Sequence, residues 1–159
     1  MGRITDRIFP IDPVVAMAGL DVPARTAWRA IREERFRLCW DRAFVEYGED
    51  EEGLWMEQRG ITLSRAVFHL YEDANPEAEE YTLGAELSEG PIWLREAREG
   101  WLIRGEGRFS HVRLEVFARI PPFFVRRYIW AVNSARSARR VAALKLWVET
   151  NHPLPEGGV

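Results

Sequence analysis

Apolar and polar residues alternate along positions 111–120, just before two consecutive prolines. The apolar side chains at every second position are Val112, Leu114, Val116, Ala118 and Ile120. A period of two places such side chains on one face of an extended chain. The segment is therefore predicted to be a strand with one buried face.

Other runs are typical of strands and are separated by polar turns, such as the acidic segments 48–53 and 73–80. Short apolar or alternating runs bounded by turn residues favour strands. The interval at 92–105 is expected to be interrupted near Gly100, because glycine weakens a strand interior. The predicted strand segments are 13–20, 38–47, 54–63, 65–72, 81–88, 92–105 and 111–120.

Two segments have helical patterns. Residues 21–36 begin with a proline two residues after Asp21, and proline is favoured in the first turn of a helix. From Pro122 to about residue 150 there is no further glycine or proline, and apolar residues recur every three or four positions. Pro121 lacks the N–H that a ladder needs, whereas Pro122 suits a helix start. A strand is therefore predicted to end there and a long helix to follow.

The order of these elements is strand, helix, about six strands and long helix. Six consecutive strands with short turns form an antiparallel meander, and such a sheet commonly buries one face. The two helices must then cover its concave face. This predicts an α+β protein, and a length of 159 residues fits one domain over 1–159 with a core of about 13–150.

The C-terminal segment has two neighbouring apolar stripes. One consists of Phe124, Tyr128, Ala131, Ala135, Ala138 and Ala142. The other contains Val125, Ile129, Val132, Val141, Leu144 and Val148. Alanines above a curved sheet either pack closely or leave a cavity, and both interpretations stay open. The seven tryptophans are candidate walls of such a cavity, because ligand pockets are mostly apolar and aromatic.

Five short motifs occur in order along residues 13–150. They are "VPARTAW" at 22–28, "CWD" at 39–41, "SRAVF" at 64–68, "GWLI" at 100–103 and "VRLEVFARIPPFFV" at 112–125. Together they resemble the START superfamily, which includes bacterial polyketide cyclases. Ala66 stands where an acid is usual. The resemblance implies the helix-grip fold, in which a curved antiparallel sheet wraps around a long C-terminal helix and encloses an apolar cavity.

By this resemblance the chain is expected to bind a hydrophobic small molecule, such as a lipid, a sterol or a polyketide, between the sheet and the C-terminal helix. One alternative is an aromatase or cyclase that acts on a carrier-bound polyketide. A third interpretation is a structural adaptor or dimer whose interior is filled by its own tryptophans. No cofactor or metal is expected. The residues expected to contact the ligand are Trp40, Arg59, Phe68, Leu83, Ala85, Trp101, Leu114, Val116, Tyr128, Ala131 and Ala135.

No catalytic residue is assigned from the sequence. Its three histidines lack the HxxxH or HxH spacing of a metal site, and Cys39 is the sole cysteine. If chemistry occurs, an acid or base inside the cavity would transfer protons. Phe68 and His69 cannot both face that cavity, because neighbouring strand residues point to opposite faces. The polar residues that could contribute are Arg59, Arg65, His69, Tyr81 and Asp41.

Charge is unevenly distributed. Residues 121–150 hold six basic residues and a single acid, whereas the whole chain has a net charge of −3, so the remainder is acidic. The basic segment is either a solvated helix face or a docking patch for an acidic carrier protein or an anionic membrane. The acidic remainder argues against nucleic-acid binding. The absence of an apolar leader and the single cysteine favour the cytoplasm. The proposed docking residues are Arg126, Arg127, Arg136 and Arg140.

Overall fold

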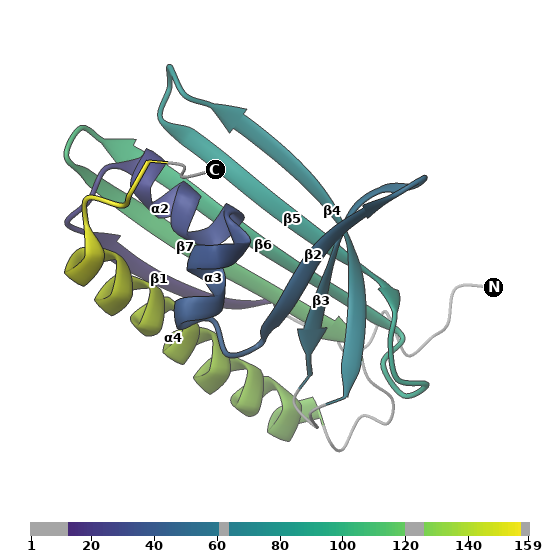
Figure 1. The fold of residues 1–159 in the computed structure, drawn as a ribbon. Helices are drawn as coiled ribbons and strands as arrows, with labels where there is room; N and C mark the ends of the chain where they lie inside the picture. The colour runs from purple at the N-terminus through teal and green to yellow at the C-terminus, as the bar shows by residue number, and fades with distance from the viewer. Residues whose placement is uncertain (1–12, 61–63, 120–125, 157–159) are drawn as a thin grey trace.

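A computed structural model describes residues 13–60, 64–119 and 126–156. These residues form one antiparallel sheet and three helices, shown in Figure 1. The elements are β1 (Val14–Leu20), α2 (Ala24–Arg32), α3 (Glu34–Trp40), β2 (Phe44–Asp50), β3 (Gly53–Arg59), β4 (Arg65–Asn75), β5 (Glu80–Glu89), β6 (Glu96–Glu106), β7 (Phe109–Arg119) and α4 (Arg126–Asn151). The predicted α+β architecture and element order are confirmed.

The sheet has seven strands in the order β1-β7-β6-β5-β4-β3-β2. The six strands after α3 form the predicted meander, and β1 pairs with β7 from Val14 opposite Val116 to Leu20 opposite Ser110. The sheet is strongly curved, and α2, α3 and α4 all lie on its concave side (Figure 1). Register shifts in β2 and at Val67 of β4 mark bulges, which bend strands locally.

The core lies between this concave face and the helices. On the inner strands, Leu83 of β5 is opposite Trp101 of β6, which in turn is opposite Leu114 of β7, and all three are buried. Burying one large apolar side chain contributes about 1.5–3 kcal/mol to stability. From the helices, the core also receives Ala27, Ala30, Ile31, Val141, Leu144 and Val148.

The predicted strand at 38–47 is wrong in its first half. Residues up to Trp40 belong to α3, and β2 begins only at Phe44. The chain leaves helical geometry at Glu33 and then resumes a helix, so two short helices replace the single predicted one. Phe36, Arg37 and Trp40 recur at spacings of one and three and are all buried, so helical geometry turns them together toward the core.

The predicted interruption at Gly100 is also wrong. Strand β6 runs through it without a break, and Gly100 is opposite Gly84 on one side and Glu115 on the other. Although glycine has no side chain, its backbone N–H and C=O groups are still available for strand pairing. The sheet therefore continues through Gly100 on both sides. The predicted Pro121–Pro122 corner lies outside the described residues.

The alanine stripe of α4 faces solvent rather than the sheet. Ala131, Ala135, Ala138 and Ala142 are exposed, and Tyr128 is 67% exposed. The second stripe faces inward, since its members Val141, Leu144 and Val148 are buried. Burial free energy grows with apolar area, so the face with branched side chains packs on the sheet and the alanine face does not.

Candidate functional site

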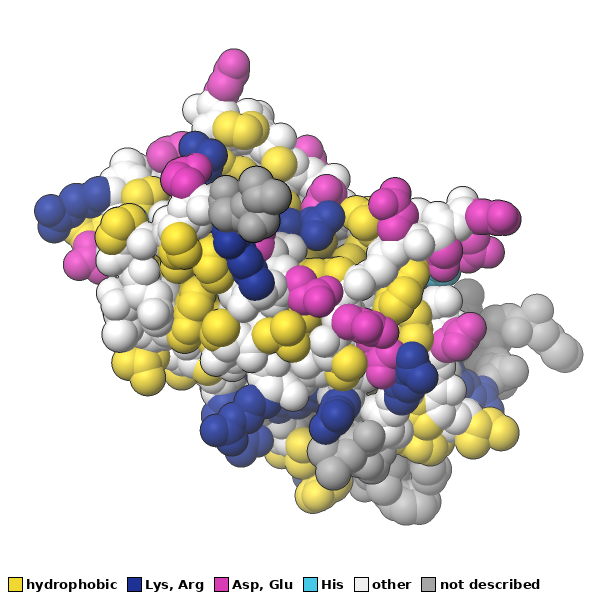
Figure 2. Space-filling model, viewed as in Figure 1, with side chains coloured by type: hydrophobic (Ala, Val, Ile, Leu, Met, Phe, Trp, Pro, Cys, Tyr) yellow, Lys and Arg dark blue, Asp and Glu magenta, His cyan; other side chains and the backbone are white. Residues whose placement is uncertain are grey.

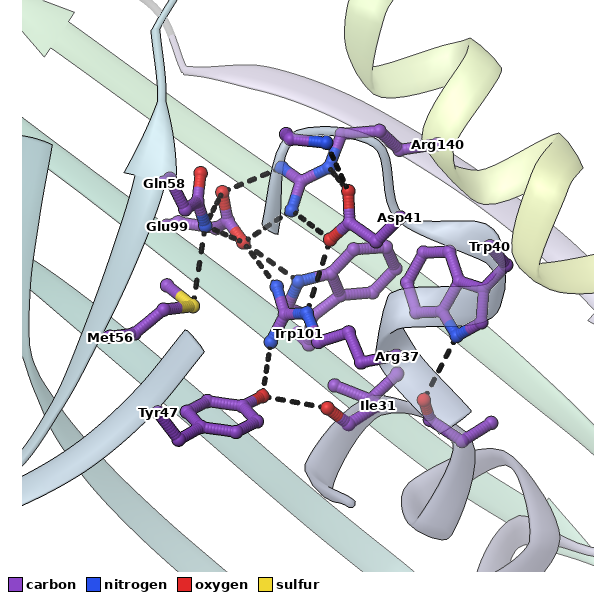
Figure 3. A network of polar contacts seen from close by, with 12 residues as sticks. Ile31, Arg37, Trp40, Asp41, Tyr47, Met56, Gln58, Glu99, Trp101 and Arg140 are labelled. Atoms are coloured by element: carbon purple, nitrogen blue, oxygen red, sulfur yellow. Dashed lines mark hydrogen bonds and ion pairs between the residues drawn. The ribbon is translucent and has the colours of Figure 1, made fainter. Parts of the chain in front are cut away.

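Four charged side chains meet in the interior between α3, α4 and β6 (Figure 3). Arg140 donates from Nη1 to Oε2 of Glu99 at 2.6 Å and from Nη2 to Oδ2 of Asp41 at 2.8 Å. Arg37 donates from Nε to Oδ2 of Asp41 at 3.1 Å and from Nη2 to Oε1 of Glu99 at 3.3 Å. Each carboxylate thus lies between two arginines. We call Arg37, Asp41, Glu99 and Arg140 the ion network.

Neutral groups satisfy the remaining polar atoms of the ion network. The indole N–H of Trp101 donates to Oε1 of Glu99 at 2.8 Å, and Gln58 donates to both Glu99 oxygens. Arg37 also donates to the hydroxyl of Tyr47, which donates to the carbonyl of Ile31 at 2.7 Å. Within the described chain no buried side-chain nitrogen or oxygen lacks a partner. Hydrogen bonds to all of these polar atoms offset the free-energy cost of removing the charges from water.

The ion network keeps its carboxylates ionised. Burial would raise the pKa of Glu99, but the charge and hydrogen bonds of Arg140 and the charge of Arg37 outweigh it and lower the pKa to about 2. The same competition holds the pKa of Asp41 well below its usual value. Efficient acid–base catalysis needs a pKa near the working pH. Neither carboxylate meets that condition.

Aromatic rings enclose the helix side of the ion network. Trp40 and Trp101 pack edge to face with ring centroids 5.6 Å apart, and the Arg140 guanidinium lies 5.4 Å from the Trp101 ring. Trp40 is held in place by an N–H donation to the carbonyl of Ala30. These two buried rings fill part of the interior between β6 and the helices.

A small pocket lies on the other side of the ion network. Its volume is about 70 Å³. Apolar residues of the strands and of the segment between β5 and β6 line one wall, Asn133 and Ser137 of α4 line another, and Glu99 and Arg140 form its polar end. Pockets for drug-sized ligands measure roughly 300–1,000 Å³. In this conformation the pocket admits a small apolar group but not a whole sterol. The apolar wall consists mainly of Ala66, Phe68, Leu94, Ala97 and Val116.

A larger and more open groove of about 550 Å³ adjoins this pocket. It lies between the end of α3, the start of β2 and α4. Arg59, Gly60, Arg136 and Arg140 line both spaces. Arg136 donates to the backbone carbonyl of Arg59 at this boundary. The pocket and the groove are therefore neighbours that share one wall.

Known structures show the same chain path at low sequence identity. The Zhui aromatase/cyclase from Streptomyces sp. R1128 aligns with a TM-score of 0.65 and 13% identity over 90% of this chain and 96% of that chain. The lipid transfer and protein localization domain of human StarD13 aligns with a TM-score of 0.65 and 14% identity over 88% and 77%. A START superfamily protein from Mycobacterium smegmatis aligns with a TM-score of 0.61 and 14% identity over 87% of this chain and 97% of that chain.

The chain has a START-like helix-grip fold. The expectation drawn from its short motifs is thereby confirmed for the fold, and identities this low establish the fold alone. No family model matches the sequence, and no curated protein matches it.

The START-like fold brings some of the predicted ligand-contacting residues together and separates others. Arg59, Phe68 and Val116 line the pocket. Leu83, Trp101 and Leu114 lie in the core instead, and Ala85 is buried in the smaller cluster around Phe68. Trp40 also belongs to the core and lines the adjoining groove. Tyr128, Ala131 and Ala135 are exposed on the outer side of α4, so their predicted placement toward a cavity is wrong.

The polar residues considered for proton transfer do not converge. Asp41 belongs to the ion network, and Tyr81 stacks on Trp28 with centroids 5.4 Å apart. Arg65 pairs with Glu57, and His69 lies 3.1 Å from Glu52. Phe68 faces the pocket, so His69 points to the other face of β4. Only Arg59 of this set lines the pocket. Among the described residues no three His, Cys, Asp or Glu side chains could hold a metal ion.

The predicted basic docking patch is wrong for one of its members. Arg140 is 7% exposed and belongs to the ion network. Arg136 is half-buried at the boundary of pocket and groove, and Arg127 is exposed. The side chain of Arg126 lies outside the described structure. No helix in the part of the chain that the structure describes is long and apolar enough to cross a membrane.

Sequence reasoning missed Arg37, Glu99 and Arg140 as a group. The sequence patterns of β6 and α4 each contained a signal that could have found one of these residues. Glu99 falls between Ala97 and Trp101 in the inward-facing register of β6. Arg140 is four residues before Leu144 and eight before Val148, on the buried stripe of α4. An ionisable residue at a buried position predicts a partner, because buried charges are almost always paired.

Proposed function

We propose that this protein binds an apolar small molecule, with one end of the ligand in the pocket between the sheet and α4. The observation that carries this proposal is the pocket itself, whose apolar wall ends at polar side chains of Asn133, Ser137 and the ion network. A few polar groups at the end of an apolar pocket orient a ligand. The fold of lipid-transfer and cyclase proteins supports the proposal.

The volume of the pocket narrows the ligand class. About 70 Å³ accommodates the end of an acyl chain or a small ring. A complete sterol or polycyclic polyketide requires α4 or a side chain such as Arg136 to move. We therefore favour a chain-like ligand, such as a lipid or an unfolded polyketide chain, over a sterol. The ionised state of Asp41 and Glu99 does not favour the alternative of an aromatase or cyclase.

Filling the pocket tests the proposal. Ala97 of β6 is buried and lies opposite Ala118 of β7 at the pocket wall. Ala97→Leu should occupy the pocket with little loss of stability, since added methylenes fill existing space. Ala135→Leu places the same side chain on the exposed face of α4 and is the matched control. Binding of 1-octanol is measured by isothermal titration calorimetry and by the change in total tryptophan fluorescence, to which Trp93 of the pocket contributes.

We expect wild type and Ala135→Leu to bind 1-octanol with equal affinity and Ala97→Leu to lose binding while it keeps its melting temperature. Native mass spectrometry of freshly purified protein should also find an apolar ligand in the first two and not in the third. Octanol binding that persists in Ala97→Leu would contradict the pocket as the site. Wild type that binds no octanol and carries no ligand would contradict the function.

An acidic carrier protein or an anionic membrane surface remains a proposed partner. Arg127 and Arg139 are exposed on α4 and could contact either one. Arg140 cannot, because Asp41 and Glu99 hold it inside. The cytoplasm is the proposed compartment, in keeping with the exposed free thiol of Cys39.

A further inference from the structure

The groove beside the pocket is lined by arginines without carboxylates. Arg42 follows α3, Arg59 ends β3, and Arg136 and Arg139 lie one turn apart on α4. No Asp or Glu is among the described residues that line this groove. In the described chain, none of Arg42, Arg59 and Arg139 has an ion pair with a carboxylate. The groove therefore has three cationic side chains without an ion-pair partner in the described chain, and a fourth, Arg136, whose charge Glu99 and Asp41 offset only in part. Figure 2 shows Lys and Arg side chains gathered around α4 on this face.

Arg140 provides an internal comparison, because it lines the same groove but is neutralised. Both of its carboxylate partners lie within 3.0 Å. The situation of Arg136 is different. Burial and the positive charge of Arg140 lower the pKa of Arg136, and Glu99 and Asp41 oppose this less strongly. An anion in the groove would relieve this crowding of like charges.

Apolar side chains lie among the arginines, which distinguishes the groove from a plain charged surface. Trp40, Ala43, Val132 and Ala143 contribute to its walls. An arginine fork near apolar walls binds anions more strongly than one in open water, because the local dielectric is lower. The groove is thus suited to an anionic group that is attached to an apolar body.

We infer that the groove binds the phosphate group of an amphipathic ligand whose apolar chain enters the adjoining pocket. The inference rests on the proposed function and adds the ligand's charged end to it. The two spaces share Arg59, Gly60 and Arg136, so a ligand that extends from one to the other passes the boundary that these residues form. A carboxylate is satisfied by a single arginine fork, whereas a phosphate offers three acceptor oxygens and more charge. Four arginines around one groove match the phosphate.

The test compares octyl phosphate with 1-octanol, which share a chain and differ in the phosphate. The key variant is Arg42→Ala with Arg139→Ala, because both residues line the groove and neither lines the pocket. Its matched control is Arg104→Ala with Arg113→Ala. These two exposed arginines pair with Glu80 and Glu115 on β5 and β7. Both double variants remove two positive charges, so a general charge effect would appear in both.

We expect wild type to bind octyl phosphate about tenfold or more tightly than 1-octanol, since charged hydrogen bonds are strong. The groove variant should bind octyl phosphate only as tightly as 1-octanol, with unchanged octanol affinity. The control variant should behave as wild type. The phosphate advantage should also shrink as salt rises. Inorganic phosphate alone should bind far more weakly than octyl phosphate.

Three outcomes would overturn the inference while the proposed function stands. These are equal affinities of wild type for the two octyl compounds, an equal loss in both double variants, and full retention of the phosphate advantage in the groove variant. Failure of both compounds to bind would instead overturn the proposed function and the inference with it.

Two further probes distinguish the source of the phosphate. A short-chain lysophosphatidic acid represents a lipid headgroup, and octanoyl-phosphopantetheine represents a carrier-type thioester. Binding of at least one must depend on Arg42 and Arg139.

Discussion

Arg140 of α4 and Glu99 of β6 are joined by two hydrogen bonds, of 2.6 and 3.0 Å, inside the protein. The pair ties the long helix to the middle of the sheet at the end of the pocket. Asp41 extends the contact to the end of α3. The ion network therefore joins the two elements that a ligand would separate if it entered between sheet and helix.

Removing Arg140 should destabilise the protein strongly. Arg140→Met leaves two buried carboxylates facing only Arg37, and breaking a buried ion pair on one side costs about 3–5 kcal/mol. The neighbouring Arg139→Met removes the same charge from an exposed position and should change stability by less than about 0.5 kcal/mol. Urea unfolding monitored by circular dichroism measures both. Equal stabilities of the two variants would show that the ion network does not stabilise the fold.

Stability should fall in acid because of Glu99. Its pKa drops from an ordinary 4.5 to about 2 in the folded protein. A lowered folded-state pKa means that this contribution is present above pH 4.5 and is lost as pH falls toward 2. The pKa of Asp41 is lowered as well, so its contribution is lost in the same direction.

Glu99→Gln should therefore be less stable than wild type at neutral pH, and the difference should narrow as the pH approaches 2. Thermal unfolding across a pH series checks this. Glu89→Gln, on the exposed end of β5, should run parallel to wild type throughout. A gap between wild type and Glu99→Gln that stays constant with pH would contradict the assignment.

Tyr47 should matter through its hydroxyl group. It accepts a hydrogen bond from the buried Arg37 and donates one to the carbonyl of Ile31. Tyr47→Phe leaves a buried donor and a carbonyl without this partner, which costs about 1–3 kcal/mol. Tyr71→Phe is the control, because Tyr71 is 60% exposed on the outer face of the sheet. Chemical denaturation should separate the two variants, and identical midpoints would rule out this role for the hydroxyl.

The exposed face of α4 should tolerate large side chains. Ala135→Trp should change the free energy of unfolding by less than about 0.5 kcal/mol, because Ala135 faces solvent. Leu144→Ala, on the buried stripe, should cost about 2–5 kcal/mol through the cavity that it creates. Differential scanning calorimetry measures both. A strongly destabilised Ala135→Trp would place the alanine face against another part of the protein.

Much of the fold could be predicted from local pattern. The alternation in β7 and the helical spacing in α4 each come from a single segment, and they predicted the right element type. The boundary near Trp40 could not be predicted in this way. A short apolar run fits a strand or a helix equally well, and the packing of Phe36 and Trp40 against other elements decided for α3.

The sequence by itself determined the meander, the terminal helix and the motifs that resemble a START-like fold, because these depend on periodicity and order along the chain. Only the tertiary structure decided which stripe of α4 faces the sheet and that Arg37, Asp41, Glu99 and Arg140 meet. These four residues are spread over 104 positions and three elements. Their meeting depends on strand register and helix rotation, which are set by the total apolar area buried.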